Sequence, residues 1–289
     1  MRRIVRKSLF VVCPVLLAVG PMSYGAVIHV DDDGTADFAT IQAAIDEAID
    51  GDTILVAPGT YMGGGNRDID FAGKAITVRS KDGPRTCIID CQGSEADPHR
   101  GFYFHSGEDA NSILEGVSII NGYADDGAGI WCYEASPRII RCMVLGNTAY
   151  FSGGGVFASR SSSLIANCIV SGNETGGDGG GLYCNGDPGA TIRNCTISDN
   201  RAGGSGGGVT VGMGQGEVHV HETILWGNSA PHGTQLARVM CGSVVDCMKA
   251  IVQFSCIEPG PNSTVQYRGG HRLKVSSKAT TTSLKILSW

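Results

Sequence analysis

The chain has 289 residues, which suits one large domain or two small ones, and it combines 43 glycines with 7% aromatic and 17% charged residues. Because glycine costs about 1 kcal/mol at each helix-interior position, this composition disfavours a helical bundle and favours a turn-rich β architecture. Acidic residues outnumber basic ones, 28 to 22, which makes the chain a poor candidate for binding nucleic acid.

Residues 1–25 have the layout of a signal peptide. A basic start is followed by an apolar run over 8–20 that is too short to span a bilayer comfortably. Small residues at Ser23 and Gly25 place the expected cleavage near Gly25, with a retained membrane anchor as the alternative. Removing four of the 22 basic residues leaves 18 against 28 acidic ones, a net charge near −10. We therefore expect a protein that is secreted or held at the cell surface or in the periplasm, with no stable membrane span after cleavage.

Residues 26–61 predict a strand, a short helix and a second strand, which together form an N-terminal cap. Strands are expected over 26–30 and 53–57, with Thr40 as the helix N-cap and Gly51 as the residue that ends the helix. The helix has an apolar face of Ile41, Ala44, Ile45 and Ala48. Such a helix would cover the open end of a stack of strands and protect its unpaired edge.

An acidic turn follows the first expected strand. Asp31, Asp32 and Asp33 precede Gly34, and three carboxylates in a turn could bind Ca²⁺. The other ligands of an EF-hand loop are missing, so a simple solvated turn is the alternative. Calcium is the one cofactor for which the sequence offers a candidate site.

The centre of the chain is a repeat. Asn147, Asn173, Asn200 and Asn228 recur at spacings of 26, 27 and 28 residues, and Gly122 takes the same place in an earlier copy. Apolar residues stand eight, five and three positions before each marker, and a further apolar pair follows each glycine run. The spacing of two within these pairs predicts β-strands with one buried face. Each repeat is therefore one structural unit that stacks on the next.

A repeat of this length fits one coil of a β-helix with three short strands. The consensus of leucine-rich repeats is missing, and a propeller blade needs about 40 residues. We expect an all-β fold, a single-stranded right-handed parallel β-helix (solenoid) of about eight coils over 26–260, with the short N-terminal capping helix. Residues 261–289 lack the repeat and are basic, so we expect an irregular or disordered tail.

The recurring polar residues have architectural explanations. Each Asn is expected at a turn, where Asn tolerates left-handed backbone and its amide can bond to the next Asn along the axis. The glycine runs supply backbone freedom at the following corner. A phosphate-binding loop is the alternative, but no Lys-Ser/Thr and no helix pattern follows the glycines. Cys142, Cys168 and Cys195 form an inward column, which favours buried thiols over disulfides.

Three aromatic residues occupy one outward position of successive coils. Trp131, Phe157 and Tyr183 lie between two inward columns, so alternation points them away from the core at about 4.8 Å spacing. Such a ladder could contact sugar rings or a partner protein. The alternative is a self-packed stack that the protein covers with its own loops.

At this point a family resemblance is plain. The segment DFATIQAAIDEAIDGDTILVAPGTY looks like the N-terminal cap of the pectin-lyase-like right-handed parallel β-helix superfamily. The coils resemble those of exported bacterial "right-handed parallel β-helix repeat-containing" proteins, and together the match covers about 26–258. The resemblance implies the fold, while superfamily members range from polysaccharide lyases and hydrolases to adhesin-like surface proteins.

The motifs of the superfamily's enzymes are incomplete here. Asn147-Thr148-Ala149 has Ala where polygalacturonases carry Asp, and Asp125-Asp126 precedes it rather than following. No Asp column accompanies the arginines that a lyase would need. We therefore expect a non-catalytic exported scaffold that contacts polysaccharide or cell-surface partners. The alternative is a polysaccharide lyase or glycoside hydrolase acting on uronate-rich polymers.

Overall fold

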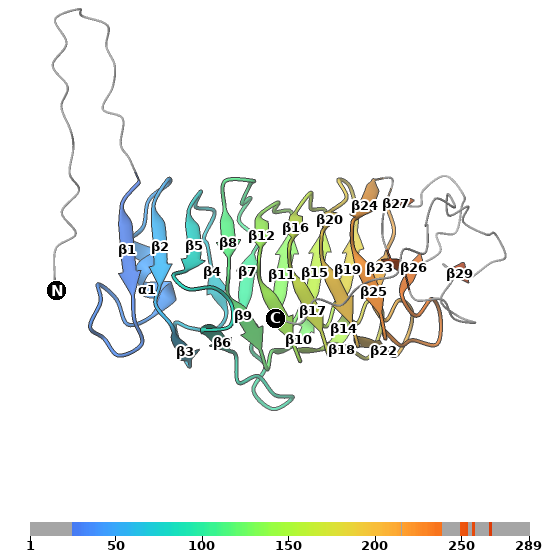
Figure 1. The fold of residues 1–289 in the computed structure, drawn as a ribbon, viewed down its shortest axis with the longest axis horizontal. Coiled ribbons are helices and arrows are strands. Elements are labelled where there is room, and N and C mark those ends of the chain that lie inside the picture. Colours follow the sequence, from blue (N-terminus) through green and yellow to red (C-terminus); the bar gives the residue numbers. More distant parts are fainter. Residues whose placement is uncertain (1–24, 215, 239–248, 254–255, 258–265, 268–289) are drawn as a thin grey trace, which may run out of the picture.

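The computed structural model describes residues 25–214, 216–238, 249–253, 256–257 and 266–267. The chain winds into a right-handed parallel β-helix of about eight coils with one short helix at its N-terminal end (Figure 1). The all-β solenoid predicted from the repeat is therefore confirmed. The predicted signal peptide and most of the predicted tail lie outside the described residues. β29 (Gln266–Tyr267), within the predicted tail, pairs in parallel with β26 (Leu236–Arg238).

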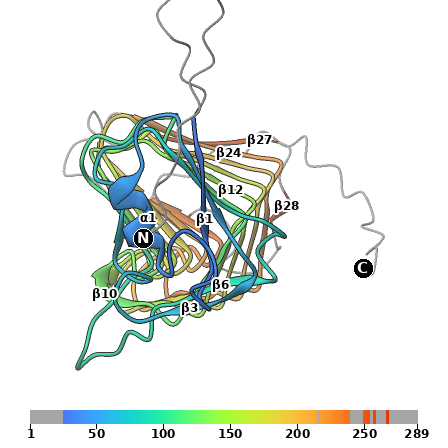
Figure 2. The same cartoon turned by 90° about the vertical axis from the view of Figure 1, so that its left-hand side faces the viewer.

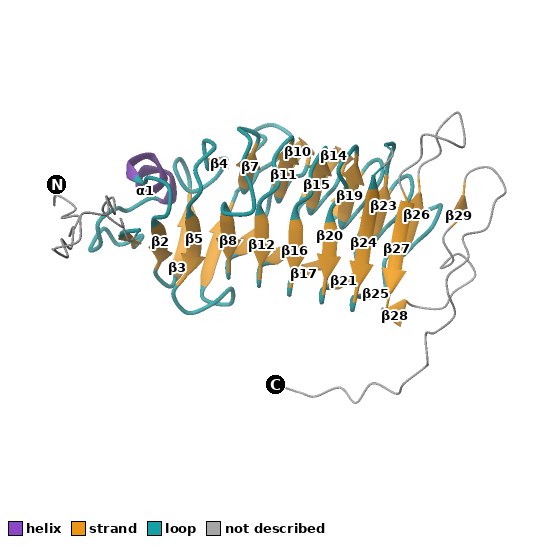
Figure 3. Ribbon diagram, turned by 90° about the horizontal axis from the view of Figure 1, so that it is seen from above, coloured by secondary structure: helices purple, strands orange, loops and turns teal. Residues whose placement is uncertain are grey.

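Three long parallel sheets form the sides of the solenoid (Figure 3). The first sheet contains β1 (Val27–Val30), β2 (Thr53–Val56), β5 (Thr77–Ser80), β8 (Ile113–Glu115), β12 (Arg138–Ile140), β16 (Leu164–Ala166), β20 (Thr191–Arg193), β24 (Glu217–His221) and β27 (Lys249–Gln253). The second contains β3 (Gly59–Met62), β6 (Cys87–Asp90), β9 (Ser118–Ile120), β13 (Met143–Leu145), β17 (Ile169–Ser171), β21 (Thr196–Ser198), β25 (Ile224–Trp226) and β28 (Cys256–Ile257). The third contains β4 (Ile69–Asp70), β7 (Phe102–Phe104), β11 (Ile130–Tyr133), β15 (Val156–Ser159), β19 (Leu182–Asn185), β23 (Val209–Val211), β26 and β29.

The central coils contain a fourth strand that the sequence did not predict. A short sheet lies between the second and third sheets along the chain, and it consists of β10 (Tyr123–Asp126), β14 (Thr148–Ser152), β18 (Glu174–Thr175) and β22 (Arg201–Ala202). The expectation of three strands per coil is therefore wrong for these coils. Residues after each Asn marker lie extended beside the same residues of the next coil, so their backbone groups pair along the axis.

The helix α1 (Ile41–Glu47) lies at the N-terminal end of the solenoid, as Figure 2 shows. Its apolar face is buried as predicted, and the Thr40 hydroxyl accepts a hydrogen bond from the Ala43 N–H at 3.4 Å. The predicted end at Gly51 is wrong, since the helix stops at Glu47 and Ala48 is already extended. The buried Asp52 carboxylate, which accepts from the Ile49 N–H, holds the turn that replaces the last helical residues.

The interior is built from columns of like residues in register. The column that precedes each Asn marker by eight positions is fully buried and pairs strand by strand along the first sheet; it comprises Leu114, Ile139, Ile165, Ile192 and Val220. The seven cysteines whose side chains the structure describes are buried free thiols: Cys87, Cys91, Cys132, Cys142, Cys168, Cys184 and Cys195. The expectation of buried thiols is therefore confirmed for these residues. Burial raises the pKa of the Cys87 and Cys184 thiols to about 12.

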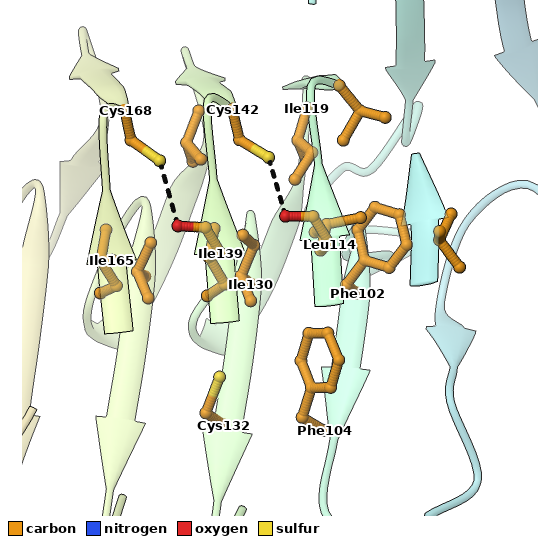
Figure 4. Close-up of a cluster of buried hydrophobic side chains, with 14 of the residues drawn as sticks. Phe102, Phe104, Leu114, Ile119, Ile130, Cys132, Ile139, Cys142, Ile165 and Cys168 are labelled. Atoms are coloured by element: carbon orange, nitrogen blue, oxygen red, sulfur yellow. Dashed lines mark hydrogen bonds between the residues drawn. The ribbon is translucent and has the colours of Figure 1, made fainter. Parts of the chain in front are cut away.

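The cysteine column also continues the hydrogen bonding between coils. Figure 4 shows the Cys142 thiol directed at the Leu114 carbonyl oxygen and the Cys168 thiol directed at the Ile139 carbonyl oxygen. The sulfur-to-oxygen distances are 3.7 and 3.5 Å, and in both cases the acceptor belongs to the preceding coil. A small thiol therefore fills the core at this position and still offers a weak donor to the neighbouring coil.

The Asn column is a buried amide ladder. Its members are Asn147, Asn173, Asn200 and Asn228. In the first three, the side-chain Nδ2 donates to the Oδ1 of the next Asn at 2.9–3.0 Å, and the backbone N–H donates to the same oxygen. Asn228 is the last member, and its Nδ2 donates to the Gln235 Oε1 at 2.6 Å. The predicted left-handed backbone at Asn is wrong. The preceding residue adopts it instead, with φ of 56–66° at Gly146, Gly172, Asp199 and Gly227. This residue makes the turn, which leaves the Asn amide free to point inward.

The helix content of the described part of the chain is limited to α1. Within residues 25–238 and the short strands described beyond them, no helix is long and apolar enough to cross a membrane.

Candidate functional site

The outward face of the third sheet carries a stack of four aromatic rings. Tyr103, Trp131, Phe157 and Tyr183 occupy matching positions on β7, β11, β15 and β19, and each is half-buried. Successive ring centroids lie 4.6, 6.3 and 5.4 Å apart, with interplanar angles of 14°, 9° and 5°. We call these four residues the aromatic stack. It contains the three predicted aromatic residues together with Tyr103.

The rings of the aromatic stack lie against each other. Parallel rings at these distances occupy one another's faces, so mainly ring edges are directed away from the sheet. This arrangement matches the self-packed alternative more closely than a row of open ring faces. Tyr103 was missed because its coil precedes the recognisable repeats. The alternation of buried Phe102 and Phe104 around it was the signal that could have found it.

Arg100 lies at the N-terminal end of the aromatic stack. Its guanidinium carbon lies 4.7 Å from the Tyr103 ring centroid and 5.7 Å from that of Trp131, and its Nη1 donates to the Asp126 carbonyl oxygen at 3.0 Å. Burial lowers the pKa of Arg100, although nearby acidic groups oppose this shift. A partly desolvated guanidinium over two rings is a cation–π contact that stabilises this end of the stack.

A polar column lies close to the aromatic stack. Asp126 pairs in register with Ser152, and Ser152 forms a bridge with Asp178, so the two carboxylates stand two coils apart. The Asp178 carboxylate accepts a hydrogen bond from the Ser205 N–H at 2.6 Å. Gly127 and Gly179, which follow the two aspartates in the chain, lie against Phe157 and Tyr183 of the stack. Burial raises the pKa of Tyr183, and the charges of Asp178 and Asp126 add to the shift.

Asp126 has an environment unlike that of an exposed carboxylate. Burial raises its pKa, and the repulsion of Asp125 adds to this shift, while bonding to the Ser152 backbone and the charge of Arg100 oppose it. Two carboxylates in different environments, separated by two strand spacings of roughly 10 Å in total, are a pattern found in acid–base sites. The sequence did not reveal this pair because Asp126 and Asp178 are not on adjacent coils. The coils between and after them carry Ser152 and Ser205 at the same position, so no column of Asp is visible.

The predicted acidic turn lies away from this face, directly after β1. The Asp31 carboxylate accepts from the Asp33 N–H at 3.5 Å, and the Asp33 carboxylate accepts from the Thr35 N–H at 2.8 Å. The hydrogen bonds to Thr35 lower the pKa of Asp33. Asp32 lies beside Gly59, the first residue of β3. Among the described residues, no three His, Cys, Asp or Glu side chains are grouped so that they could hold a metal ion. Calcium binding at this turn stays a prediction.

Comparisons with known proteins identify the fold. A family model described as "Right handed beta helix region" matches residues 64–237. The chain is similar to a pectate lyase structure, "Crystal structure of pectate lyase Pel9A", with 16% identity over 84% of this chain and 73% of that one and a TM-score of 0.49. It is also similar to a pectin methylesterase from carrot, with 14% identity over 82% and 84% of the two chains and a TM-score of 0.36. No curated protein matches the chain.

Proposed function

Since the chain belongs to the right-handed β-helix family, we propose that it is an exported, non-catalytic scaffold that contacts polysaccharide or a cell-surface partner. The contact surface is the outer face of the third sheet. The observation that carries this proposal is the aromatic stack, whose four ring edges repeat along the solenoid beside the carboxylates of Asp126 and Asp178. The acidic composition argues against nucleic acid as the partner.

The geometry suits an extended polymer that runs along the axis of the solenoid. The stack repeats once per coil, so a polymer of identical units meets similar groups at regular intervals of about 4.8 Å or a multiple of it. The rings hold one another in place, so little side-chain entropy would be lost on binding. Ring edges carry partial positive charge and can contact sugar oxygens, while the nearby carboxylates can accept hydrogen bonds from sugar hydroxyls.

Binding of the full chain to immobilised polysaccharides tests this proposal. The panel would include polygalacturonate, alginate, xylan and cellulose, together with intact cells as a source of surface components. We expect Trp131→Ala to weaken retention about tenfold because it interrupts the stack, whereas Trp131→Phe keeps a ring in place and retains most of the binding. Equal retention of the wild type and both variants would discard the stack as the contact surface.

A glycoside hydrolase is the second candidate function, because Asp126 and Asp178 lie on one face. Inverting hydrolases place two carboxyl groups about 6.5–9.5 Å apart, close to two strand spacings. Asp126, whose pKa is raised by burial, would be the acid, and Asp178 would be the base. A reducing-sugar assay on uronate-rich polymers tests this candidate, with Asp126→Asn expected to abolish any turnover. Formation of 4,5-unsaturated products would point to a lyase instead.

A further inference from the structure

A second group of aromatic side chains lies on the short sheet, at a bulge in β14. Ala124 pairs with Ala149 and Asp126 pairs with Ser152, so two residues of β14 stand opposite the single residue Asp125. The two residues are Tyr150 and Phe151, which we call the aromatic pair. A bulge adds one residue to a strand and redirects the side chains around it. Here it leaves neighbouring residues 58% and 54% exposed.

The rings of the aromatic pair are open to solvent. Their centroids lie 4.7 Å apart at an interplanar angle of 83°, so the edge of one ring meets the face of the other. This contact covers one face of one ring only, unlike the parallel packing of the aromatic stack. Among the Phe, Trp and Tyr residues of the described chain, Tyr150 and Phe151 have the largest exposed fractions. Exposed apolar surface of this kind marks interaction sites.

The next two coils carry glycine at the positions that align with the aromatic pair. Hydrogen bonds from Gly176 to the Ala149 carbonyl and from Asp178 to the Phe151 carbonyl align this segment with β14. The following coil aligns in the same way, through bonds from Gly203 to Thr175 and from Gly204 to Gly177. The result is a glycine shelf, which consists of Gly176, Gly177, Gly203 and Gly204.

Close packing of the coils accounts for the glycine shelf. A Cβ on Gly176 would overlap the Tyr150 carbonyl oxygen, and one on Gly203 would overlap the Gly176 carbonyl oxygen. The coils therefore require glycine at these positions. Coil packing does not require aromatic side chains at positions 150 and 151. The neighbouring coils fill the matching positions with Asp125 or with glycine. Neither residue belongs to the buried core.

We propose that the aromatic pair and the glycine shelf form a binding site for a neutral polysaccharide. The shelf is two coils wide, roughly 10 Å, which is enough for about two sugar rings. A sugar lying on the shelf would place its apolar C–H face against an open aromatic face. Its hydroxyls would reach the polar side chains at the margins of the shelf, Ser152 and Asp178. This inference shares its class of ligand and the carboxylate of Asp178 with the proposed function, but its aromatic contacts come from different residues, Tyr150 and Phe151.

The charges around the shelf favour a neutral polymer over a uronate polymer. Asp125, Glu174 and Asp178 surround it with carboxylates. The cation beside them, Arg201, already forms an ion pair with Glu174 at 3.4 Å. A polymer that carries a carboxylate on each unit would meet like charges, whereas a neutral polymer would meet hydrogen-bond acceptors.

Retention of the full chain on swollen cellulose, on mannan and on polygalacturonate tests the site. We expect the double substitution Tyr150→Ala/Phe151→Ala to weaken retention on a neutral polymer about tenfold. Trp226→Ala is the matched control, because Trp226 is 49% exposed but lies on the second sheet, and we expect it to leave retention unchanged. Equal retention of wild type and double variant, retention on polygalacturonate alone, or no retention on any polymer would overturn the inference.

Oxidative footprinting of the wild type then locates the contact. We expect a bound neutral polymer to protect Tyr150 and Phe151 from hydroxyl radicals and to leave Trp226 as reactive as before. Protection of Trp131 alone would support the proposed function and overturn this inference. Protection of the aromatic pair alone would support this inference and move the contact away from the third sheet. A wild-type dimer that the double substitution converts to a monomer, without loss of retention, would reassign the aromatic pair to self-association.

Discussion

The aromatic stack and the aromatic pair use the same residue types in different arrangements. In the stack, the rings of Trp131, Phe157 and Tyr183 lie nearly parallel on successive coils and cover one another. In the pair, Tyr150 and Phe151 lie side by side on one coil, and the next two coils carry glycine. Whether an outward aromatic residue presents mainly its ring edge or an open ring face therefore depends on what the neighbouring coils place beside it.

The difference follows from register. Along the third sheet β7, β11, β15 and β19 pair without a register shift, so their outward aromatic residues meet on successive coils. Along the short sheet the bulge between β10 and β14 breaks this correspondence at the aromatic pair. We expect substitutions inside the coil to cost most stability, substitutions in the aromatic stack to cost less, and substitutions in the aromatic pair to cost least.

The largest loss in the free energy of unfolding should come from substitutions in the buried amide ladder. The losses expected for the two aromatic regions are compared with it. Asn200→Ala removes an acceptor for two donors of Asn173 and leaves buried groups without partners. We expect a loss of about 3 kcal/mol in the free energy of unfolding, measured by urea denaturation. The exposed Asn111→Ala is the control and should change it by less than about 0.5 kcal/mol. Similar values for the two variants would contradict a stabilising role of the ladder.

The aromatic stack should show an intermediate effect. Trp131→Ala removes a half-buried ring that contacts Tyr103, Phe157 and Tyr133. We expect a loss of about 2 kcal/mol in the free energy of unfolding, below the 3–5 kcal/mol typical of fully buried Trp or Phe. Trp131→Phe should recover about half of this loss. If Trp131→Ala changes the free energy by less than about 0.5 kcal/mol, the stack is not a stabilising element.

The aromatic pair should be nearly neutral for stability. Tyr150→Ala/Phe151→Ala removes two exposed rings that bury little surface, so the free energy of unfolding should change by less than about 0.5 kcal/mol. The same variant should lose polysaccharide retention. A large loss of stability would mean that the pair belongs to the core packing, and the contrast with the aromatic stack would disappear.

The smallest effect should be the pH dependence contributed by Asp126. Its pKa is raised by burial, so the folded state favours the protonated form more than the unfolded state does. The stabilising contribution is therefore complete below the unfolded pKa and is lost as pH rises through the folded pKa. Asp126→Asn should flatten this part of the stability–pH curve and slightly favour the variant at neutral pH. A steeper curve for the variant would contradict the direction of the shift.

Much of the architecture was predictable because each coil repeats the same local rules. Alternation placed the Leu114-to-Val220 column inside, and the recurrence of Asn and Cys predicted an amide ladder at the turns and an inward column of thiols. Thr40 was predictable as a cap because its side chain bonds within the same turn. The end of α1 was not predictable, since the Asp52 carboxylate replaces the last helical bonds with its own contact.

The candidate sites were only partly predictable. Trp131, Phe157 and Tyr183 were expected side by side on the outer face, but whether their faces lie open or against one another depends on ring orientations that follow from packing. Arg100 and Asp126 lie 26 residues apart, and the sequence carries no signal that the guanidinium reaches that carbonyl. The bulge that exposes Tyr150 and Phe151 arises from a difference of one residue between adjacent coils.

By itself the sequence determined the solenoid, its capping helix and the inward columns, because a repeat near 27 residues and an alternation of two act through local geometry and burial. The tertiary structure alone decided the fourth strand, the orientation of the aromatic stack and the open face of the aromatic pair. These features depend on the register between coils. Which side chains lie beside an outward residue is determined only when the coils stack.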